Sequence, residues 1–93
     1  MVVGICTLEF HLPGCRSLKT KRKFLNRLKG RLRSRFNVAV SEVEHQDLWQ
    51  RALVGVVSVS GSRQRLDATF QKVLRDVEVA GDGHLVRFET EYL

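Results

Sequence analysis

The segment from residue 15 to residue 36, CRSLKTKRKFLNRLKGRLRSRF, constrains the fold more than any other part of the chain. It contains ten lysines and arginines and no acidic residue. Such a charge density usually keeps a chain unfolded. Leucines nevertheless recur in it at helical spacing, at Leu18, Leu25, Leu28 and Leu32. The pattern therefore predicts one helix, from an N-cap at Ser17 to about residue 34, with a buried leucine stripe and a basic outer surface.

Along the rest of the chain, apolar residues recur in some segments every two residues, as in strands, and in others every 3.6 residues, as in helices. Apolar runs and alternations predict strands at residues 2–12, 38–44, 52–60 and 85–92. A second helix is expected after Gly61 and Ser62, because an apolar stripe follows: Leu66, Phe70, Val73, Leu74 and Val77. Asn37 is expected to close the first helix in a left-handed conformation, and residues 81–83 are expected to form a turn.

The order of these elements is βαββαβ within 93 residues, which is the size of one domain. Right-handed crossovers would place both helices on the same side of the sheet. The sequence therefore predicts an α+β fold of the ferredoxin-like type. This is a four-stranded antiparallel sheet with two helices on one face, in a single domain that spans residues 1–93.

The cysteines and the apolar segments of the sequence indicate where in the cell the protein is expected. Cys6 and Cys15 form neither a disulfide framework nor a CxxC pair, so both thiols are expected to be reduced in the cytoplasm. The first residues, MVVGICTLEF, lack the basic region of a signal peptide. No run approaches the ~20 apolar residues of a membrane span. We expect a cytoplasmic protein without membrane contact.

One face of the predicted sheet has no helix to cover it. Its expected centre consists of Val3, Ile5, Val54 and Val56, with a rim of Glu9, Glu89 and Glu91. An apolar centre inside a charged rim is typical of a face that a partner covers. The open face is therefore expected to form a homodimer or to bind a small ligand between two subunits.

Two segments carry a resemblance to a known family. VGICTLEFHLPGCRSLKTKR and RFNVAVSEVEHQDLWQRA, followed by a valine-rich strand, resemble the bacterial YlxP-like family of unknown function. The resemblance covers nearly the whole chain. It implies a ferredoxin-like fold in a bacterial cytosol, together with an association with genes for translation and ribosome maturation. It implies no catalytic activity.

The basic helix has an energetic cost that points to an anionic partner. Five like-charge pairs at i,i+4 spacing each cost about 0.2–0.5 kcal/mol. Cations in the first turn oppose the helix dipole. Phosphates would relieve both effects, whereas a face that only keeps a protein soluble would include glutamates. The expected nucleic-acid contacts are Arg16, Lys19, Lys21, Arg22, Lys23, Arg27, Lys29, Arg31, Arg33 and Arg35.

The kind of nucleic acid follows from the sheet. RRM domains stack single-stranded RNA on aromatic side chains of their central strands. The corresponding positions predicted here are Val3, Ile5, Thr7, Val54, Val56 and Ser58, which include no aromatic residue. We therefore expect contacts with the backbone of structured RNA, with ribosomal RNA as a candidate.

Lys21 and Trp49 each have two interpretations. Lys21 lies within the leucine arc, so it either extends along the helix edge to reach water or directs a buried ammonium at Glu42, Glu44 or an anion. Trp49, in the connection at residues 46–50, either stacks on a base or anchors a partner, or else folds over the sheet edge or over a dimer mate.

Catalysis has little support in the sequence. The loop LPGCRSLK resembles the phosphate loop of acylphosphatases in its location, but their glycine-rich pattern is absent. Cys15 lies near Arg16 and the helix start, where a thiol can be activated, but an incidental loop thiol is far commoner and no nucleophile–base pair is readable. His11, His45 and His84 lack metal-ligand spacing. We expect no enzyme activity, no metal and no cofactor.

Overall fold

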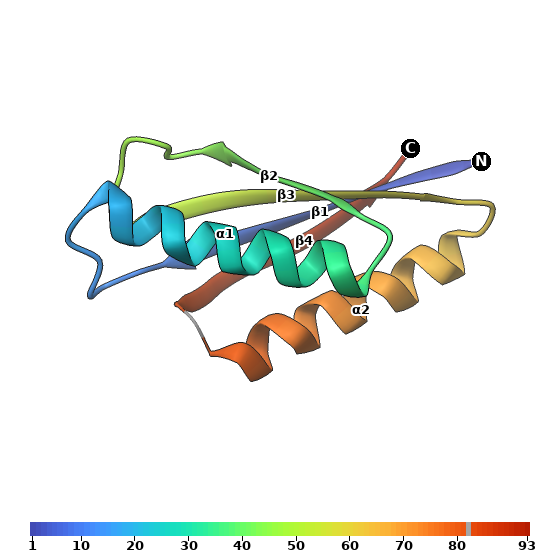
Figure 1. Cartoon of the computed structure of the whole chain (residues 1–93). Coiled ribbons are helices and arrows are strands. Elements are labelled where there is room, and N and C mark those ends of the chain that lie inside the picture. The colour runs from blue at the N-terminus through green and yellow to red at the C-terminus, as the bar shows by residue number, and fades with distance from the viewer. Residues whose placement is uncertain (82) are drawn as a thin grey trace.

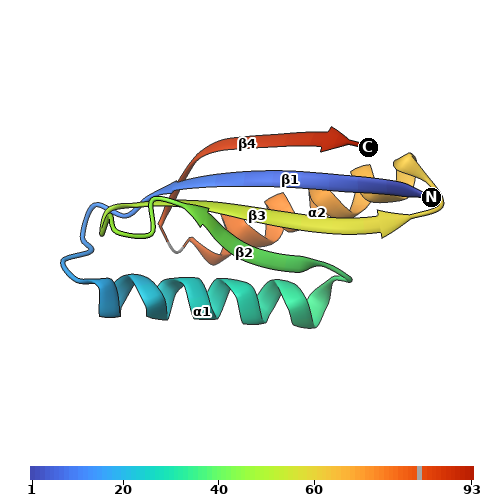
Figure 2. The same cartoon turned by 90° about the horizontal axis from the view of Figure 1, so that it is seen from above.

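The computed structural model describes residues 1–81 and 83–93. In chain order its elements are β1 (Val2–His11), α1 (Leu18–Arg35), β2 (Ala39–Glu44), β3 (Arg51–Ser60), α2 (Arg63–Ala80) and β4 (His84–Tyr92). The strands form one antiparallel sheet in the order β2-β3-β1-β4. Both helices cover the same face, with α1 alongside β2 and α2 beneath β1 and β3 (Figures 1 and 2). The predicted ferredoxin-like fold is confirmed.

The helix ends follow from local hydrogen bonds. Ser17 caps α1 by accepting a hydrogen bond from the Thr20 amide at 3.1 Å, as predicted, and Ser62 caps α2 in the same way. The prediction for Asn37 was wrong. The helix stops at Phe36 in an extended conformation, and His45 is the non-glycine residue with positive φ in the described chain. Gly81 ends α2 in the left-handed conformation, while Asp82 of the predicted turn lies outside the described residues.

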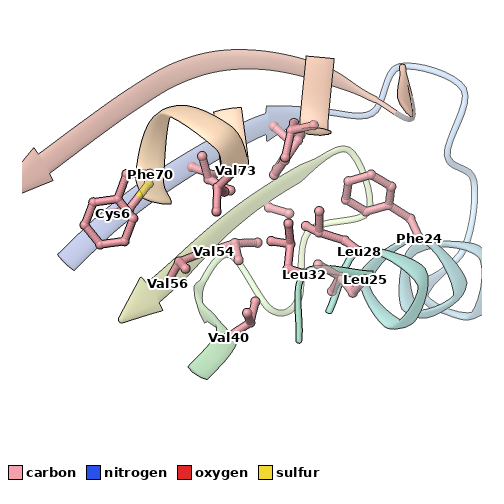
Figure 3. Close-up of a cluster of buried hydrophobic side chains, with 14 of the residues drawn as sticks. Cys6, Phe24, Leu25, Leu28, Leu32, Val40, Val54, Val56, Phe70 and Val73 are labelled. Atoms are coloured by element: carbon pink, nitrogen blue, oxygen red, sulfur yellow. The ribbon is translucent and has the colours of Figure 1, made fainter. Parts of the chain in front are cut away.

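The core lies between the sheet and the two helices (Figure 3). Alternate residues of the two central strands point into it, and the stripes of both helices cover them. Its buried side chains include Cys6, Leu8, Phe10, Val54, Val56, Leu28, Leu32, Leu66, Phe70 and Val73. Gly4 is required where α2 approaches β1 most closely, because a Cβ there would lie 2.8 Å from the Phe70 ring. Within the described residues, neither helix has the length and apolarity that crossing a bilayer requires.

The structure corrects the predicted open face. Val54 and Val56 pair with Leu8 and Cys6, so they point toward the helices and are fully buried. A shift of one residue along a strand moves every side chain to the other face. The apolar side chains on the uncovered face of β3 are therefore Leu53, Val57 and Val59, and these join Val3 and Ile5 of β1.

Burial of Cys6 predicts a pH dependence of stability. Desolvation raises the pKa of this thiol to about 12, compared with 9.0 for an ordinary cysteine. Below pH 9 the Cys6 thiol is protonated in both the folded and the unfolded protein. Between pH 9 and 12 this thiol ionises only in the unfolded protein. We therefore expect the free energy of unfolding to decrease as the pH rises above about 9. Urea unfolding of wild type and Cys6→Ala across this range would measure it. Identical slopes in the two proteins would contradict this origin.

Candidate nucleic-acid interface

The basic residues of α1 divide into two rows and one buried exception. One row is spaced by four residues, and we call it the basic ridge: Lys19, Lys23, Arg27, Arg31 and Arg35. Because four residues exceed one helical turn, each step rotates the ridge by about 40°. It therefore faces solvent at Lys19 and has turned toward α2 at Arg31 and Arg35. The ridge crosses the helix diagonally.

The end of the ridge that faces α2 is fixed by one carboxylate. Arg31 Nε donates to Asp76 Oδ1 at 2.6 Å, and Arg35 Nη1 donates to Oδ2 at 2.5 Å. The Asp76 side chain is only 4% exposed, whereas that of Arg35 remains 61% exposed. The two guanidinium groups are thus positioned by a shared acceptor while part of their surface still faces water.

The second row lies on the other flank of α1, toward the edge strand β2. It consists of Arg22, Lys29 and Arg33. Arg33 donates to the carbonyl of Val40 at 3.0 Å and so covers a main-chain group of this edge. Between the two rows, Gly30 is exposed, and a Cβ placed there would contact nothing within 4 Å.

The first turns of α1 hold the charges that are most available to a ligand. Arg16, Lys19, Arg22 and Lys23 are exposed. In the described part of the chain, none of these four has a hydrogen bond or an ion pair from its side chain. Their charge can therefore be satisfied by an external anion without breaking an internal contact.

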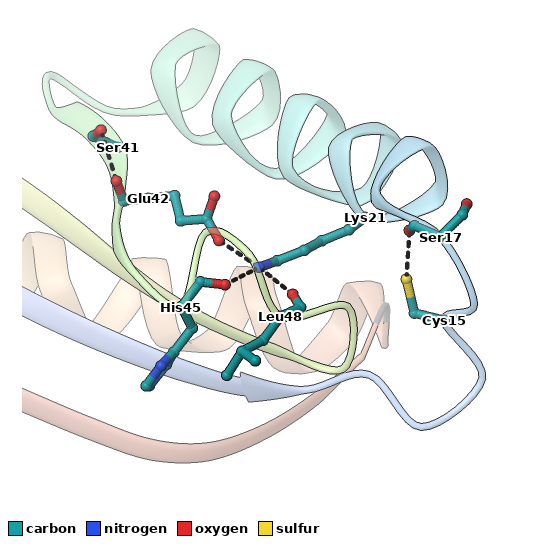
Figure 4. A network of polar contacts seen from close by, with 7 residues as sticks. All are labelled: Cys15, Ser17, Lys21, Ser41, Glu42, His45 and Leu48. Atoms are coloured by element: carbon teal, nitrogen blue, oxygen red, sulfur yellow. Dashed lines mark hydrogen bonds and ion pairs between the residues drawn. The ribbon is translucent and has the colours of Figure 1, made fainter.

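Lys21 is the basic residue of α1 that is buried instead of exposed (Figure 4). Its side chain is 2% exposed and its ammonium group donates to the carbonyls of His45 and Leu48, both at 2.6 Å. Glu42 Oε2 lies 2.6 Å from the same nitrogen. That oxygen has no aligned hydrogen bond within the described chain, so its contact with Lys21 is an ion pair. Two carbonyls thus accept hydrogen bonds from the ammonium group, and the carboxylate lies close enough to compensate its charge.

This network decides between the two interpretations of Lys21. The side chain does not extend along the helix edge to water, and the interpretation as a buried ammonium directed at Glu42 is confirmed. Including Lys21 among the nucleic-acid contacts was wrong, because a buried and fully paired ammonium cannot reach a phosphate. The other nine predicted contacts are exposed or half-buried.

Lys21 also fixes the connection between β2 and β3. Its two carbonyl partners bracket a turn that presents Leu48 and Trp49, which are 45% and 49% exposed. Together with His11 they line a shallow hollow of about 580 Å³. Trp49 is therefore not buried in the core. Its role as an anchor for a partner stays a prediction.

The loop before α1 is held by contacts of its own. Cys15 is buried, and its thiol donates to the carbonyl of Ser17 at 3.3 Å. The amide of Gln50 donates to the carbonyl of Cys15 at 3.4 Å. These contacts give Cys15 a packing role in the loop.

Pairing of β1 with β4 reveals a contact that sequence spacing missed. His11 lies directly opposite His84. The antiparallel register of β1 and β4, which are far apart in the chain, places them together, and residue spacing alone carries no such signal. No group of three metal-binding side chains occurs in the part of the chain that the structure describes.

The open sheet face has an apolar end and a charged end. Val57 and Val59 are 37% and 51% exposed beside Val3 and Ile5. At the other end Glu9 bridges Arg51 and Arg87 at 2.9 Å each, and the hydrogen bond from Arg51 is the main cause that lowers the pKa of Glu9. The corrected positions on β1 and β3 still include no aromatic residue, so RRM-like stacking remains disfavoured.

Comparison with known proteins places the chain in a family. Residues 3–90 match the family described as "Protein of unknown function (DUF503)". The chain belongs to this family. It is also 36% identical over 77 residues to "Uncharacterized protein YlxP" of Bacillus subtilis (strain 168), covering 83% of this chain and 84% of that protein. The predicted resemblance to YlxP-like proteins is thereby confirmed.

A solved structure gives a weaker match. It is described as "Structure of the REP associates tyrosine transposase bound to a REP hairpin". The match has a TM-score of 0.45 and 12% identity, over 98% of this chain and 55% of that one. This chain thus spans about half the length of that protein.

Proposed function

We propose that this protein is a non-catalytic cytoplasmic module that binds the phosphate backbone of structured RNA through α1. Ribosomal RNA is the candidate we favour. The observation that supports it most is the exposed charge of Arg16, Lys19, Arg22 and Lys23 at the start of one helix, which has no partner within residues 1–81 and 83–93. This arrangement is unfavourable for the isolated protein and favourable beside phosphates.

The distribution of charge over the whole molecule supports the same function. Ten of the sixteen basic residues lie between Arg16 and Arg35, while the rest of the chain has six basic and ten acidic residues. The anion-attracting surface is therefore confined to one side of the fold. Such polarity orients a protein on a polyanion and accelerates its association.

A salt titration of RNA binding tests this function. The probe is a fluorescein-labelled RNA hairpin with a stem of about 16 base pairs, which offers two minor grooves. We expect micromolar or tighter binding at about 0.15 M salt, measured by anisotropy, with a steep dependence of log K on log salt. Loss of all binding at that salt would show that the basic residues attract RNA only weakly and non-specifically at low salt, and it would contradict the proposal.

A second candidate function uses the opposite face. We propose that the apolar end of the open sheet pairs two copies of the chain. Val3, Ile5, Val57 and Val59 form a contiguous partly exposed patch there. Pairing through this patch would leave the basic helices of both copies facing outward, so that an RNA could contact both with a gain in avidity.

Substitution of Val57 tests the dimer. Val57→Asp is expected to convert a particle of about twice 10.7 kDa into one of 10.7 kDa, because it places a charge at the centre of the contact. Light scattering after size exclusion measures the mass. Val79→Asp, on the helical face, makes the same chemical change and should leave the mass unchanged. A monomeric wild type at about 100 μM would refute this pairing.

A further inference from the structure

A cavity lined mainly by charged side chains lies between the two helices. A groove of about 470 Å³ is lined by Arg31 and Arg35 of α1 and by Lys72, Arg75 and Asp76 of α2. Phe36, Val79 and Ala80 complete it. Four cationic side chains thus meet one carboxylate. No local pattern predicts this cluster, because Lys72 and Arg75 lie far along the chain from the basic segment at residues 15–36.

Asp76 positions the two arginines for a further ligand. It accepts one hydrogen bond from each guanidinium, at 2.6 and 2.5 Å. A guanidinium has five N–H donors in a rigid planar group. The single bond that each gives to Asp76 orients the plane and leaves other donors for a second acceptor. Guanidinium groups of this kind suit the oxygens of a phosphate.

The groove continues the basic ridge. The ridge rotates by about 40° per step and reaches α2 at Arg31 and Arg35, where Lys72 and Arg75 extend it. An RNA backbone that follows the ridge from Lys19 would therefore enter the groove. Phe36 and Val79 add apolar surface that a ribose could contact.

We propose that this inter-helix groove is a phosphate-binding subsite for a phosphodiester of the bound RNA. Arg31, Arg35, Lys72 and Arg75 supply the donors, and Asp76 is a positioning residue. The inference rests on the proposed RNA-binding function. It adds that α2 takes part and that binding has a fixed anchor point at one end of α1.

The main test compares two double variants on the same helix. Lys72→Ala with Arg75→Ala removes the α2 side of the groove. Arg63→Ala with Arg65→Ala removes two exposed cations near the start of α2, where Arg63 lies 4.5 Å from the centre of the Tyr92 ring. With the labelled hairpin at about 0.15 M salt, the groove variant should bind at least about tenfold more weakly, with a salt slope lower by about 2. The Arg63/Arg65 control variant should lose clearly less affinity for the hairpin. Thermal unfolding checks that both variants are folded.

A pair of charge-matched variants tests the role of Asp76. Asp76→Asn and Glu78→Gln each remove one negative charge from α2, and Glu78 is exposed. Generic electrostatics predicts tighter RNA binding in both. If Asp76 positions the arginines, Asp76→Asn should weaken binding and Glu78→Gln should strengthen it slightly. The Nε–H resonance of Arg31, observed by NMR, should shift on addition of RNA in wild type and not in Asp76→Asn.

The outcomes separate this inference from the proposed function. If Lys19→Glu with Lys23→Glu abolishes RNA binding while the groove variant binds like wild type, the RNA function stands and the groove inference is wrong. Equal losses in the groove variant and its Arg63/Arg65 control would also overturn it. Inorganic phosphate and adenosine monophosphate are expected to displace the hairpin only in the millimolar range. Displacement at micromolar concentration would show that the groove serves a free phosphorylated molecule and would refute a phosphodiester subsite.

Discussion

Lys21→Met is expected to destabilise the protein by about 3–5 kcal/mol, a large part of the stability of a small domain. The substitution leaves the Glu42 carboxylate partly buried without its cation and removes the donor from the carbonyls of His45 and Leu48. For a domain of this size the melting temperature should fall by roughly 12–40 °C. Circular dichroism during heating or urea titration measures the change.

Lys23→Met is the matched control for this prediction. It makes the same chemical change two residues further along the helix, at an exposed position, and should alter stability by no more than about 0.5 kcal/mol. Adding Glu42→Gln to Lys21→Met should recover part of the loss, because it removes the unpaired charge. A cost below about 1 kcal/mol for Lys21→Met would show that the network of Figure 4 contributes little.

The single tryptophan provides a local readout of the same network. Lys21 holds the carbonyls on either side of the turn that presents Trp49. At temperatures well below unfolding, Trp49 fluorescence in Lys21→Met should show lower anisotropy than in wild type. Unchanged anisotropy would mean that other contacts fix this turn.

The order of elements could be predicted because it depends on local periodicity. The leucines of α1 and the stripe of α2 fix two amphipathic helices, and Ser17 and Ser62 supply their caps. Topology then follows from short connections and right-handed crossovers, which leave few alternatives for βαββαβ. These rules require no knowledge of individual contacts.

The faces of the central strands could not be assigned as reliably. In β3, residues 52–59 include valines on both sides, so apolar periodicity does not reveal which side meets the helices. Pairing with β1 decides it: Val54 and Val56 lie beside Leu8 and Cys6. Long-range register of this kind is absent from a local pattern. The prediction of a left-handed Asn37 was wrong for a related reason. The path of the chain into β2 decides how α1 ends, and Phe36 is already extended there.

For the basic surface, too, local sequence patterns predict one part and tertiary packing decides the rest. Its existence was evident from composition, and its five-residue ridge from helical spacing. The burial of Lys21 required knowledge that the β2–β3 turn lies beside α1, and the groove required knowledge that α2 lies on the ridge side. Contacts between residues 24 to 45 positions apart depend on how the elements pack.

Lys19→Glu with Lys23→Glu is expected to change stability and RNA binding in opposite directions. The substitutions turn the i,i+4 pair at positions 23 and 27 from like-charged to oppositely charged, while positions 19 and 23 remain a like-charge pair. They also place two carboxylates near the positive end of the helix dipole, so the free energy of unfolding should rise by roughly 0.5–2 kcal/mol. Affinity for the labelled hairpin should fall at least about tenfold at about 0.15 M salt, which is about 1.4 kcal/mol. The salt slope should fall by about 2, one for each lost phosphate contact.

This opposition separates a functional charge from a merely tolerated one. A variant that binds poorly because it is misfolded would lose stability together with affinity, whereas here the more stable protein should be the weaker binder. Arg63→Glu with Arg65→Glu makes the same change in net charge at the start of α2, and it should weaken binding much less. If both variants bind equally weakly, only net charge matters. If Lys19→Glu with Lys23→Glu gains stability and keeps its affinity, the unfavourable charge of α1 is not explained by RNA, and the open sheet face and Trp49 become the surfaces to test.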